Sequence, residues 1–255
     1  MTDLADDAAL AADLVHEAGL LARRMRAEGL VAEHKTSVSD IVTAADKAAE
    51  RLIVNRLAAE RPHDAVVGEE GTDRPGSSGR SWVIDPVDGT YNFHHGLSWW
   101  CSAIALEDAD DVLLGAVFHP HDDALFVGGP ELPSTRNGEP LPRLADVALA
   151  QTCATTYLHP PFHDPAIGAA FVRAASGTAT LRMLGSGTMD AMAIAQGQLG
   201  VSFQHTVSDW DRLPGAAIIR GVGGEARRTT AGGVVWSVAG APTAVAEVCA
   251  ALEAG

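Results

Sequence analysis

An apolar stretch that ends in two closely spaced aspartates is the part of the sequence best suited to chemistry. Residues 82–84 predict a buried strand that runs into Asp85, and Asp88 follows three residues later. Pro86 should end the strand pairing, because proline has no amide hydrogen to donate. Across the resulting turn, the two carboxylates and the backbone carbonyl of Val87 can converge on one point.

The oxygen atoms at this turn suit a divalent metal and a phosphate group. Mg²⁺ prefers such hard ligands and completes its octahedron with water and substrate phosphate. The following residues, Gly89 and Thr90, are typical of a helix start, so their amides would face the same phosphate. Taken alone, the two aspartates could instead cap a turn, as Asp-Pro and Asp-Gly pairs often do.

Three further acidic segments also lie at the ends of predicted elements. Residues 66–68 form an apolar run that ends in Glu69-Glu70, Asp46 falls in the first turn of a predicted helix, and Asp211 opens another helix. Each of them alone could be a solvated loop, a helix cap or a charge that complements a helix dipole. Because four unrelated acidic segments share this placement, together they indicate a single site.

Other catalytic and metal-binding patterns are weaker. The segment His119-Pro-His121-Asp122 has the composition of a surface loop, and His94-His95 could only border the site. Asp-x-Asp is the spacing of aspartyl-phosphate phosphatases, whereas the chain has Asp-x-x-Asp, which argues against a carboxylate nucleophile. The sequence contains neither a Gly-x-Ser-x-Gly elbow nor a Gly-Lys-Ser/Thr phosphate loop.

The composition predicts a globular, acidic protein. The 255 residues include 18 Lys and Arg against 33 Asp and Glu, a net charge of −15, and are 47% hydrophobic. This charge argues against nucleic acid or an anionic membrane as a partner, although metals between carboxylates could still attract a small phosphate ester. Three widely spaced cysteines, an acidic N-terminus and the lack of a long apolar run predict reduced thiols in a soluble, cytoplasmic protein.

Hydrophobic periodicity predicts two unlike halves. In the first half we expect a helix over 4–28 and another from Thr43 to Pro62, with Thr43 and Asp46 forming a capping box. Strands are expected at 65–67, 81–85, 99–107, 112–118 and 124–128.

Strands and helices alternate in the second half, which favours an α/β layer stacked beside an α+β layer. The turn-rich stretch 130–145, with Asn137-Gly138, predicts a boundary between domains of residues 1–140 and 141–255. The expected strands are 147–155, 180–184, 199–204 and 233–238, and the expected helices are 164–176, 187–197, one from about 211, and 242–253.

The acidic motifs together resemble those of the inositol monophosphatase family, which are Mg²⁺-dependent, lithium-sensitive phosphatases. The resemblance covers about residues 8 to 250 and implies a layered αβαβα sandwich of the inositol monophosphatase and fructose-1,6-bisphosphatase type. The matching segments, in the order and spacing of the family, are 35–46, 68–70, 82–93 and, more loosely, 210–224.

The resemblance also implies a role for each matching residue. Two or three Mg²⁺ per subunit would be held by Glu69, Asp85, the Val87 carbonyl, Asp88 and Asp211. Asp46 and Thr90 would orient and deprotonate the attacking water beside Glu69. The substrate would contact Lys35, the amides of Gly89 and Thr90, the segment Gly185-Ser186-Gly187, Gln204 and Asp211.

The implied activity is hydrolysis of a small polyol phosphate by metal-activated water, with inositol 1-phosphate as the first candidate and a homodimer as the assembly. Members that hydrolyse inositol phosphates commonly carry a glutamate seven residues before the aspartate at 211, where this chain has Gln204. An amide lacks the charge-assisted hydrogen bond of a carboxylate. This departure weakens the case for inositol. Histidinol phosphate is an alternative substrate, because bacterial proteins that the chain resembles use this fold for it and an acidic rim of the site could hold its amine. A catalytically dormant relative that acts by binding is an alternative of another class.

Overall fold

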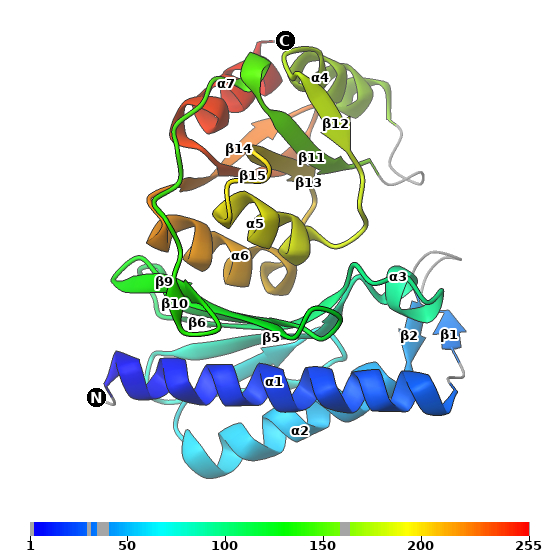
Figure 1. The fold of residues 1–255 in the computed structure, drawn as a ribbon, viewed down its shortest axis with the longest axis vertical. Coiled ribbons are helices and arrows are strands. Elements are labelled where there is room, and N and C mark those ends of the chain that lie inside the picture. The colour runs from blue at the N-terminus through cyan, green and yellow to red at the C-terminus, as the bar shows by residue number, and fades with distance from the viewer. Residues whose placement is uncertain (1–2, 30–31, 35–40, 159–163, 255) are drawn as a thin grey trace.

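Two large β-sheets and three layers of helices build the fold, and a small two-stranded sheet lies apart from them. The computed structural model describes residues 3–29, 32–34, 41–158 and 164–254. As Figure 1 shows, α1 and α2 cover the outer face of the first sheet, α5 and α6 lie between the sheets, and α4 and α7 cover the far face of the second sheet. The expected layered αβαβα sandwich is confirmed. The helices are α1 (Leu4–Glu28), α2 (Ala44–Glu60), α3 (Thr90–His94), α4 (Pro165–Ser176), α5 (Gly187–Ala195), α6 (Asp209–Gly221) and α7 (Pro242–Glu253).

The first sheet has eight strands in the order β10-β9-β8-β7-β6-β5-β3-β4, and all neighbours are antiparallel except β3 and β5. Every strand expected in this half is present, while β4, β9 and β10 were not expected. Asn137 and Gly138 do form a turn, with φ of 51° and 81°, but it joins β9 to β10 within the sheet. The strands are β3 (Ala65–Gly68), β4 (Asp73–Arg74), β5 (Ser81–Asp88), β6 (Cys101–Glu107), β7 (Val112–His119), β8 (Ala124–Gly129), β9 (Leu132–Arg136) and β10 (Glu139–Pro140).

The expectation that Pro86 ends its strand is wrong. Strand β5 continues to Asp88, and its pairing with β6 shifts register between Asp85 and Asp88. The irregularity accommodates a residue without an amide hydrogen, and the Pro86 carbonyl accepts a hydrogen bond of 2.6 Å from the Ser102 hydroxyl. Both aspartates therefore belong to one strand that is bent between them.

The second sheet has five strands in the order β12-β11-β13-β15-β14, with β11 parallel to both of its neighbours and the other pairs antiparallel. β14 was not expected, because its sequence is polar and it lies at the sheet edge. The strand expected from 147 starts only at Cys153, after a single 3-10 turn at Leu149–Gln151. The strands are β11 (Cys153–Tyr157), β12 (Thr180–Arg182), β13 (Val201–His205), β14 (Glu225–Ala231) and β15 (Val234–Gly240), and β1 (Ala32–His34) pairs separately with β2 (Ile41–Thr43).

The first sheet uses strands up to Pro140 and the second uses strands from Cys153 onward. This division supports, as a proposal, the two domains of residues 1–140 and 141–255. The three cysteines are free, with Cys101 and Cys249 buried, as expected. Among the described residues, no helix is both long enough and apolar enough to cross a bilayer.

Helix α6 packs closely on the first sheet and on α5. A side chain at Gly115 of β7 would collide with the Pro214 carbonyl, and one at Gly215 would lie 2.5 Å from the Ala191 methyl group. The helix begins at Asp209, two residues before the expected start, so Pro214 lies in its second turn rather than its first. The close packing fixes the N-terminus of α6, and with it Asp211, above the first sheet.

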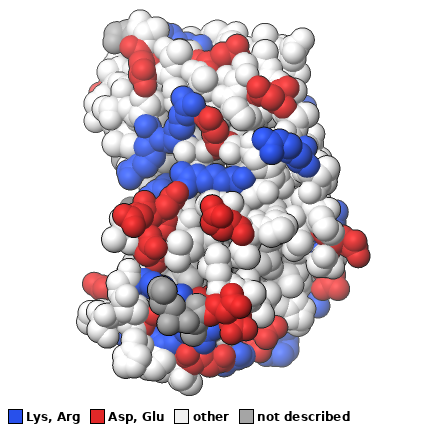
Figure 2. All heavy atoms as spheres, turned by 90° about the vertical axis from the view of Figure 1, so that its left-hand side faces the viewer, with Lys and Arg blue, Asp and Glu red and all other residues white. Residues whose placement is uncertain are grey.

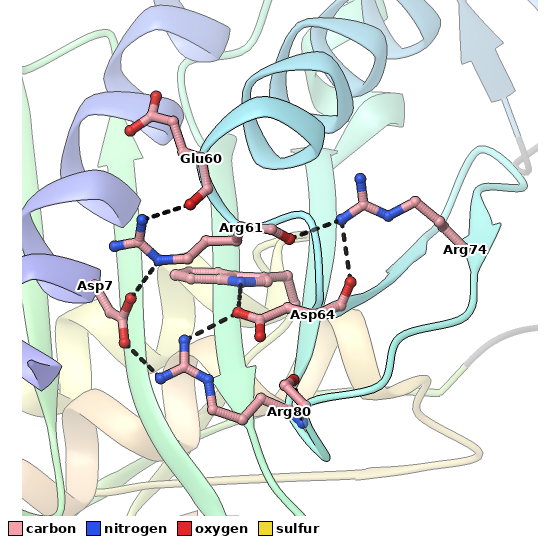
Figure 3. A network of polar contacts seen from close by, with 8 residues as sticks. Asp7, Glu60, Arg61, Asp64, Arg74 and Arg80 are labelled. Carbon is pink, nitrogen blue, oxygen red and sulfur yellow. Dashed lines mark hydrogen bonds and ion pairs between the residues drawn. The ribbon is translucent and has the colours of Figure 1, made fainter. Parts of the chain in front are cut away.

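A buried network of ion pairs ties α1 to the first sheet (Figure 3). The Asp7 carboxylate is fully buried and accepts hydrogen bonds of 2.7 Å from Arg61 and from Arg80. Arg80 also pairs with Asp64 at 2.9 Å, and the Trp82 indole donates to the same carboxylate. Burial alone would raise the pKa of Asp64, but hydrogen bonds from Ser78, Arg80 and Trp82 outweigh it, so that its pKa is lowered.

We expect Asp7→Ala to destabilise the protein by about 3 kcal/mol, because it removes a buried carboxylate that pairs with both Arg61 and Arg80 and leaves Arg80 paired with Asp64 alone. Urea unfolding of the metal-free protein measures the loss, and the exposed Asp13→Ala on the same helix is the matched control. Equal unfolding free energies for the two variants would contradict a structural role for this network.

Candidate active site

Three carboxylates, two of them buried and the third partly buried, converge where the two halves of the molecule meet. Asp85 and Asp88 come from the bent end of β5, and Asp211 comes from the first turn of α6. One carboxylate oxygen of each lies within 4.8 Å of the others, close enough for all three to hold one metal ion. The β5 aspartates are 1% and 6% exposed. The structure thus brings together residues that are more than 120 positions apart in the sequence.

Burial and like charge raise the pKa of each carboxyl in this cluster. The pKa of Asp85 is raised well above its usual value by burial first, then by the charges of Glu69, Asp88, Asp211 and Asp46. Burial also raises the pKa of Asp88 and of Asp211. Carboxylates in this arrangement either retain protons or share a cation. Because all donors are hard oxygen atoms, the cluster fits Mg²⁺.

Asp46 and Thr90 meet beside the cluster. Thr43 caps α2 as expected, and its hydroxyl and amide both donate to the Asp46 carboxylate. The Thr90 hydroxyl lies 3.3 Å from the other Asp46 oxygen and 2.9 Å from the Val87 carbonyl oxygen. Burial raises the pKa of Asp46 to about 6, against the opposing hydrogen bond from Thr43. A carboxylate with this pKa can accept a proton near neutral pH.

The carboxylate of Glu50 positions Glu69, although no sequence pattern distinguishes Glu50 from a surface acid. Glu50 of α2 is 4% exposed and accepts hydrogen bonds from the Glu70 amide at 2.8 Å and from the Thr72 amide and hydroxyl at 3.2 and 2.7 Å. Any side chain at Gly68 would collide with this carboxylate. Glu50 therefore holds the turn that carries Glu69 at the end of β3.

We expect Glu50→Ala to raise the Mg²⁺ concentration required for half-maximal activity about tenfold, because residues that support a ligand commonly have effects of this size. Titration of activity with Mg²⁺ measures the change, and the exposed Glu17→Ala on α1 serves as control. An unchanged Mg²⁺ requirement would show that the Glu69 turn does not depend on Glu50.

The second half of the chain anchors Asp88. The Asp88 carboxylate accepts hydrogen bonds from the Ser186 hydroxyl at 2.6 Å and from the Thr188 amide at 2.7 Å. The Asn92 amide donates at 2.8 Å to both the Trp99 and the Leu184 carbonyls, joining α3 to the segment before α5. The predicted substrate-binding segment 185–187 is thereby held next to the carboxylate cluster.

Two glycines permit this close approach. Gly89 and Gly185 both have φ of +87°, a conformation that glycine adopts without strain. A side chain at Gly89 would come within 3.0 Å of Ser186, and one at Gly185 within 3.0 Å of the Asn92 amide. Gly89 precedes the first residue of α3, as the sequence predicts, so its amide and that of Thr90 begin this short helix.

A cavity of about 320 Å³ adjoins the cluster, and Asp211, Gly187 and Gln204 are among its lining residues. Of the predicted substrate contacts, Gly89, Thr90, Gly185, Ser186, Gly187 and Gln204 lie around the carboxylates or this cavity. Lys35 and the loop residues 159–163 lie outside the described residues.

Asp190 also lines the cavity, although nothing in the alanine-rich sequence of α5 distinguishes it from a surface acid. It is 6% exposed and accepts a hydrogen bond of 3.0 Å from the Trp99 indole. Burial raises its pKa to about 7, with the nearby charge of Asp88 contributing and the Trp99 hydrogen bond opposing. Its carboxyl group is therefore partly protonated at neutral pH.

We expect the stability of the metal-free protein to fall between about pH 4 and pH 7 through Asp190, because over this range the folded protein binds the proton that the unfolded chain releases. Asp190→Asn retains an acceptor for Trp99 and should reduce this loss by about 2 to 4 kcal/mol. Urea unfolding at several pH values, with chelator throughout, measures the slope for both proteins. Identical slopes would contradict the raised pKa.

The segment His119-Pro-His121-Asp122 does not form a second metal centre. In the described part of the chain, the three-aspartate cluster is the single group of metal-ligating side chains with suitable spacing. His119 is buried rather than in a surface loop, and its ring lies 2.9 Å from the Ser98 carbonyl. His121 is exposed.

Comparison with known proteins places this site in a family. The model of the inositol monophosphatase family matches residues 3–252. The chain belongs to the inositol monophosphatase family. Like its relatives in that family, it is a phosphoric monoester hydrolase, and the family is metal-dependent.

Individual members of the inositol monophosphatase family support this assignment. The chain is 31% identical over 201 residues to inositol-1-monophosphatase of Rhizobium meliloti, covering 76% of this chain and 74% of the relative. It is 30% identical over 192 residues to fructose-1,6-bisphosphatase/inositol-1-monophosphatase of Thermotoga maritima, covering 75% and 73%. The solved structure of Mycobacterium tuberculosis SuhB matches with a TM-score of 0.82 and 27% identity, covering 100% of this chain and 98% of that one.

Proposed function

We propose that this family member is a Mg²⁺-dependent phosphomonoesterase of a small polyol or sugar phosphate, with inositol 1-phosphate as the first candidate. The observation that carries the proposal is the convergence of Asp85, Asp88 and Asp211 beside the contact between Thr90 and Asp46. This arrangement supplies both a cation site and a proton acceptor next to each other, as hydrolysis of a phosphate ester requires.

The proposed metal ligands are all oxygen atoms around the cluster. We assign two or three Mg²⁺ per subunit to Glu69, Asp85, the Val87 carbonyl, Asp88 and Asp211. Bound Mg²⁺ supplies a water of lowered pKa and stabilises charge on the phosphoryl and leaving oxygens.

Asp46 is the proposed proton acceptor for the attacking water. The Thr90 hydroxyl, held between Asp46 and the Val87 carbonyl, orients that water, and Glu69 assists. The raised pKa of Asp46, about 6, suits transfer of a proton near neutral pH. The Gly89 and Thr90 amides bind the phosphoryl oxygens. No covalent bond between the chain and the phosphoryl group is needed.

The leaving alcohol is proposed to occupy the cavity side of the cluster. Its hydroxyl groups would contact the segment 185–187, Gln204 and Asp211, and Lys35 would lie on the phosphate side. The Gln204 amide can donate and accept hydrogen bonds but carries no charge. The Rhizobium meliloti relative is named for inositol 1-phosphate, and the Thermotoga maritima relative also for fructose 1,6-bisphosphate, which supports a small polyol or sugar as the alcohol.

Histidinol phosphate is a second candidate, favoured by the acidic side chains of the cavity. Asp190 and Asp211 both line it and could pair with the amine of such a substrate. We further propose a homodimer located in the cytoplasm.

Phosphate release from a panel of esters tests this function. The panel contains inositol 1-phosphate, histidinol phosphate, fructose 1,6-bisphosphate and 3′-phosphoadenosine 5′-phosphate, each with Mg²⁺. We expect release from inositol 1-phosphate, and faster release from histidinol phosphate would assign the second candidate. No release from any of the four would instead favour a catalytically dormant relative that acts by binding.

A further inference from the structure

A small hydrophobic cluster connects the elements that carry the proposed catalytic residues. Ala45 of α2 immediately precedes Asp46 in the chain. Val87 of β5 supplies the carbonyl that accepts a hydrogen bond from Thr90. Phe93 belongs to α3, the same short helix as Thr90, so the position of each catalytic group depends on how this cluster packs. Its buried members are Ala22, Ala45, Val87, Phe93 and Trp100, with Met25 packed against them.

Arg26, in the last turn of α1, lies against the aromatic side chains of this cluster. Its guanidinium carbon is 5.2 Å from the centre of the Phe93 ring and 5.3 Å from the centre of a Trp100 ring. The two side chains contact each other edge to face, with ring centres 4.6 Å apart. A cation within about 6 Å of an aromatic ring centre is attracted by the electrons of the ring face. Arg26 therefore ties the aromatic part of the cluster to α1.

The same guanidinium group also binds the backbone at the end of α3. Its Nη1 atom donates to the Leu97 carbonyl at 3.1 Å and to the Phe93 carbonyl at 3.4 Å. The last carbonyls of a helix have no partners within it, and a cation beside them is favourable. Figure 1 shows the C-terminal end of α1 on the same side of the molecule as α3. Arg26 thus joins a helix of the outer layer to the helix that carries Thr90.

Helix α3 depends on such contacts for its position. It has only five residues, and a helix of this length is not stable in isolation. Its N-cap residue, Gly89, has no side chain to hold the first turn. The contact between the Thr90 hydroxyl and Asp46 is long, at 3.3 Å, so a small shift of α3 would break it. The anchors of α3 therefore control the alignment of the two residues assigned to the attacking water.

The partners of Arg26 are unusual for this acidic protein. Arg56, Arg80 and Arg220 each pair with a carboxylate. Figure 2 likewise shows acidic side chains beside basic ones on the face that it displays. In the described part of the chain, Arg26 has no carboxylate partner, and burial lowers its pKa. Its position is therefore determined by two carbonyls and two aromatic side chains rather than by an ion pair.

We propose that Arg26 is a positioning residue for the reaction, which holds α3 so that the Thr90 hydroxyl stays aligned with Asp46. The inference rests on the proposed phosphomonoesterase function, because it acts through the water that Thr90 orients. Since Arg26 binds the end of α3 opposite to Thr90, its effect on turnover passes through the helix. Arginine suits this role because its planar group can stack on aromatic rings and donate hydrogen bonds at the same time.

Replacement of arginines on α1 by methionine tests this role, because methionine has a similar helix propensity but donates no hydrogen bond. We compare Arg26→Met with two controls on the same helix that lose the same charge, Arg23→Met and Arg24→Met. Arg23 donates to the Pro120 carbonyl at 2.8 Å, just after β7, and Arg24 is exposed. We measure kcat, KM and the Mg²⁺ requirement with the ester panel, and hydrogen exchange of the amides of residues 93–97.

We expect Arg26→Met to lower kcat about tenfold, because small displacements of reacting groups have effects of this order or larger. KM and the Mg²⁺ requirement should stay unchanged, and both controls should retain the wild-type kcat. In Thr90→Ala protein, the addition of Arg26→Met should lower kcat no further, because two residues that act through one group are not additive. The amides of residues 93–97 should exchange faster in Arg26→Met than in either control.

Several results would overturn the positioning role. They are a wild-type kcat in Arg26→Met, a loss confined to KM, an equal loss in Arg23→Met, or a further loss of the same size in Thr90→Ala protein. Unchanged hydrogen exchange at residues 93–97 would also overturn it. If the wild-type protein hydrolyses no ester of the panel but this exchange increases in Arg26→Met alone, the proposed hydrolysis fails and the anchoring of α3 by Arg26 stands.

Discussion

Asp88→Asn should abolish turnover while leaving the fold intact. The aspartate contributes a negative charge to the cluster of Asp85, Asp88 and Asp211, and an amide provides at most one neutral oxygen for a metal. We expect a loss of at least about a thousandfold in kcat/KM, equivalent to roughly 4 kcal/mol of transition-state stabilisation. Measurement at saturating Mg²⁺ ensures that weakened metal binding alone does not account for the result.

The fold should tolerate this change because the local hydrogen bonds can be retained. Ser186 and Thr188 both donate to one oxygen of Asp88, and the amide oxygen of asparagine can accept the same two bonds. Unfolding of the metal-free variant should therefore occur at a denaturant concentration no lower than for wild type, since a buried like charge is removed. The exposed Asp13→Asn on α1 is the control for net charge. Near-wild-type activity of Asp88→Asn would rule out the ligand assignment.

Asp46→Asn and Thr90→Ala should reduce kcat far more than they weaken metal binding. Both residues are assigned to the attacking water, and general-base catalysis typically contributes a factor of about 10² to 10⁴. Asparagine cannot accept the proton, and alanine lacks the hydroxyl group that lies between Asp46 and the Val87 carbonyl and orients the water. Steady-state kinetics and Mg²⁺ titration of each variant separate the two effects.

Thr90→Ser supplies the matched control, because it retains the hydroxyl group that lies between Asp46 and Val87. We expect it to recover most of the activity that Thr90→Ala loses. Parallel losses of kcat and metal affinity in Asp46→Asn and Thr90→Ala would mean that the pair is structural.

The sequence allowed prediction of the features that depend on local chemistry. The capping box of Thr43 and Asp46 follows from residue types at fixed spacing, and the structure confirms it. The layered fold also follows from strand and helix periodicity together with the motifs. The convergence of Asp85 with Asp211 was expected from the family resemblance. Its physical cause, the close packing of α6 against β7 at Gly115, is not specified by any local pattern.

Other features were predicted wrongly or not at all, and each failure has a physical reason. Pro86 was expected to end a strand, but a shift in register lets β5 continue past it. β14 is an edge strand with a polar sequence, so it lacks the apolar alternation by which strands are recognised. Glu50 and Asp190 are acidic residues whose side chains are buried by the packing of their helices. Burial of this kind cannot be predicted from the residue type alone.

The site accounts for part of the net charge of −15. Three of the acidic residues converge on one point, and two more lie close enough for their charges to raise the pKa of Asp85, which makes the metal-free site unfavourable for another anion. Bound divalent cations would reverse the local sign of the charge. The acidic residues in question are Asp46, Glu69, Asp85, Asp88 and Asp211.

The most direct test of a metal-dependent active site is ester turnover as a function of Mg²⁺ in chelator-treated protein. We measure phosphate release from each ester of the panel, and ester binding by calorimetry, first with excess chelator and then with increasing Mg²⁺. Metal dependence of the site predicts no release and weak ester binding with chelator, followed by saturable recovery of both. Tight ester binding or undiminished phosphate release in excess chelator would contradict it.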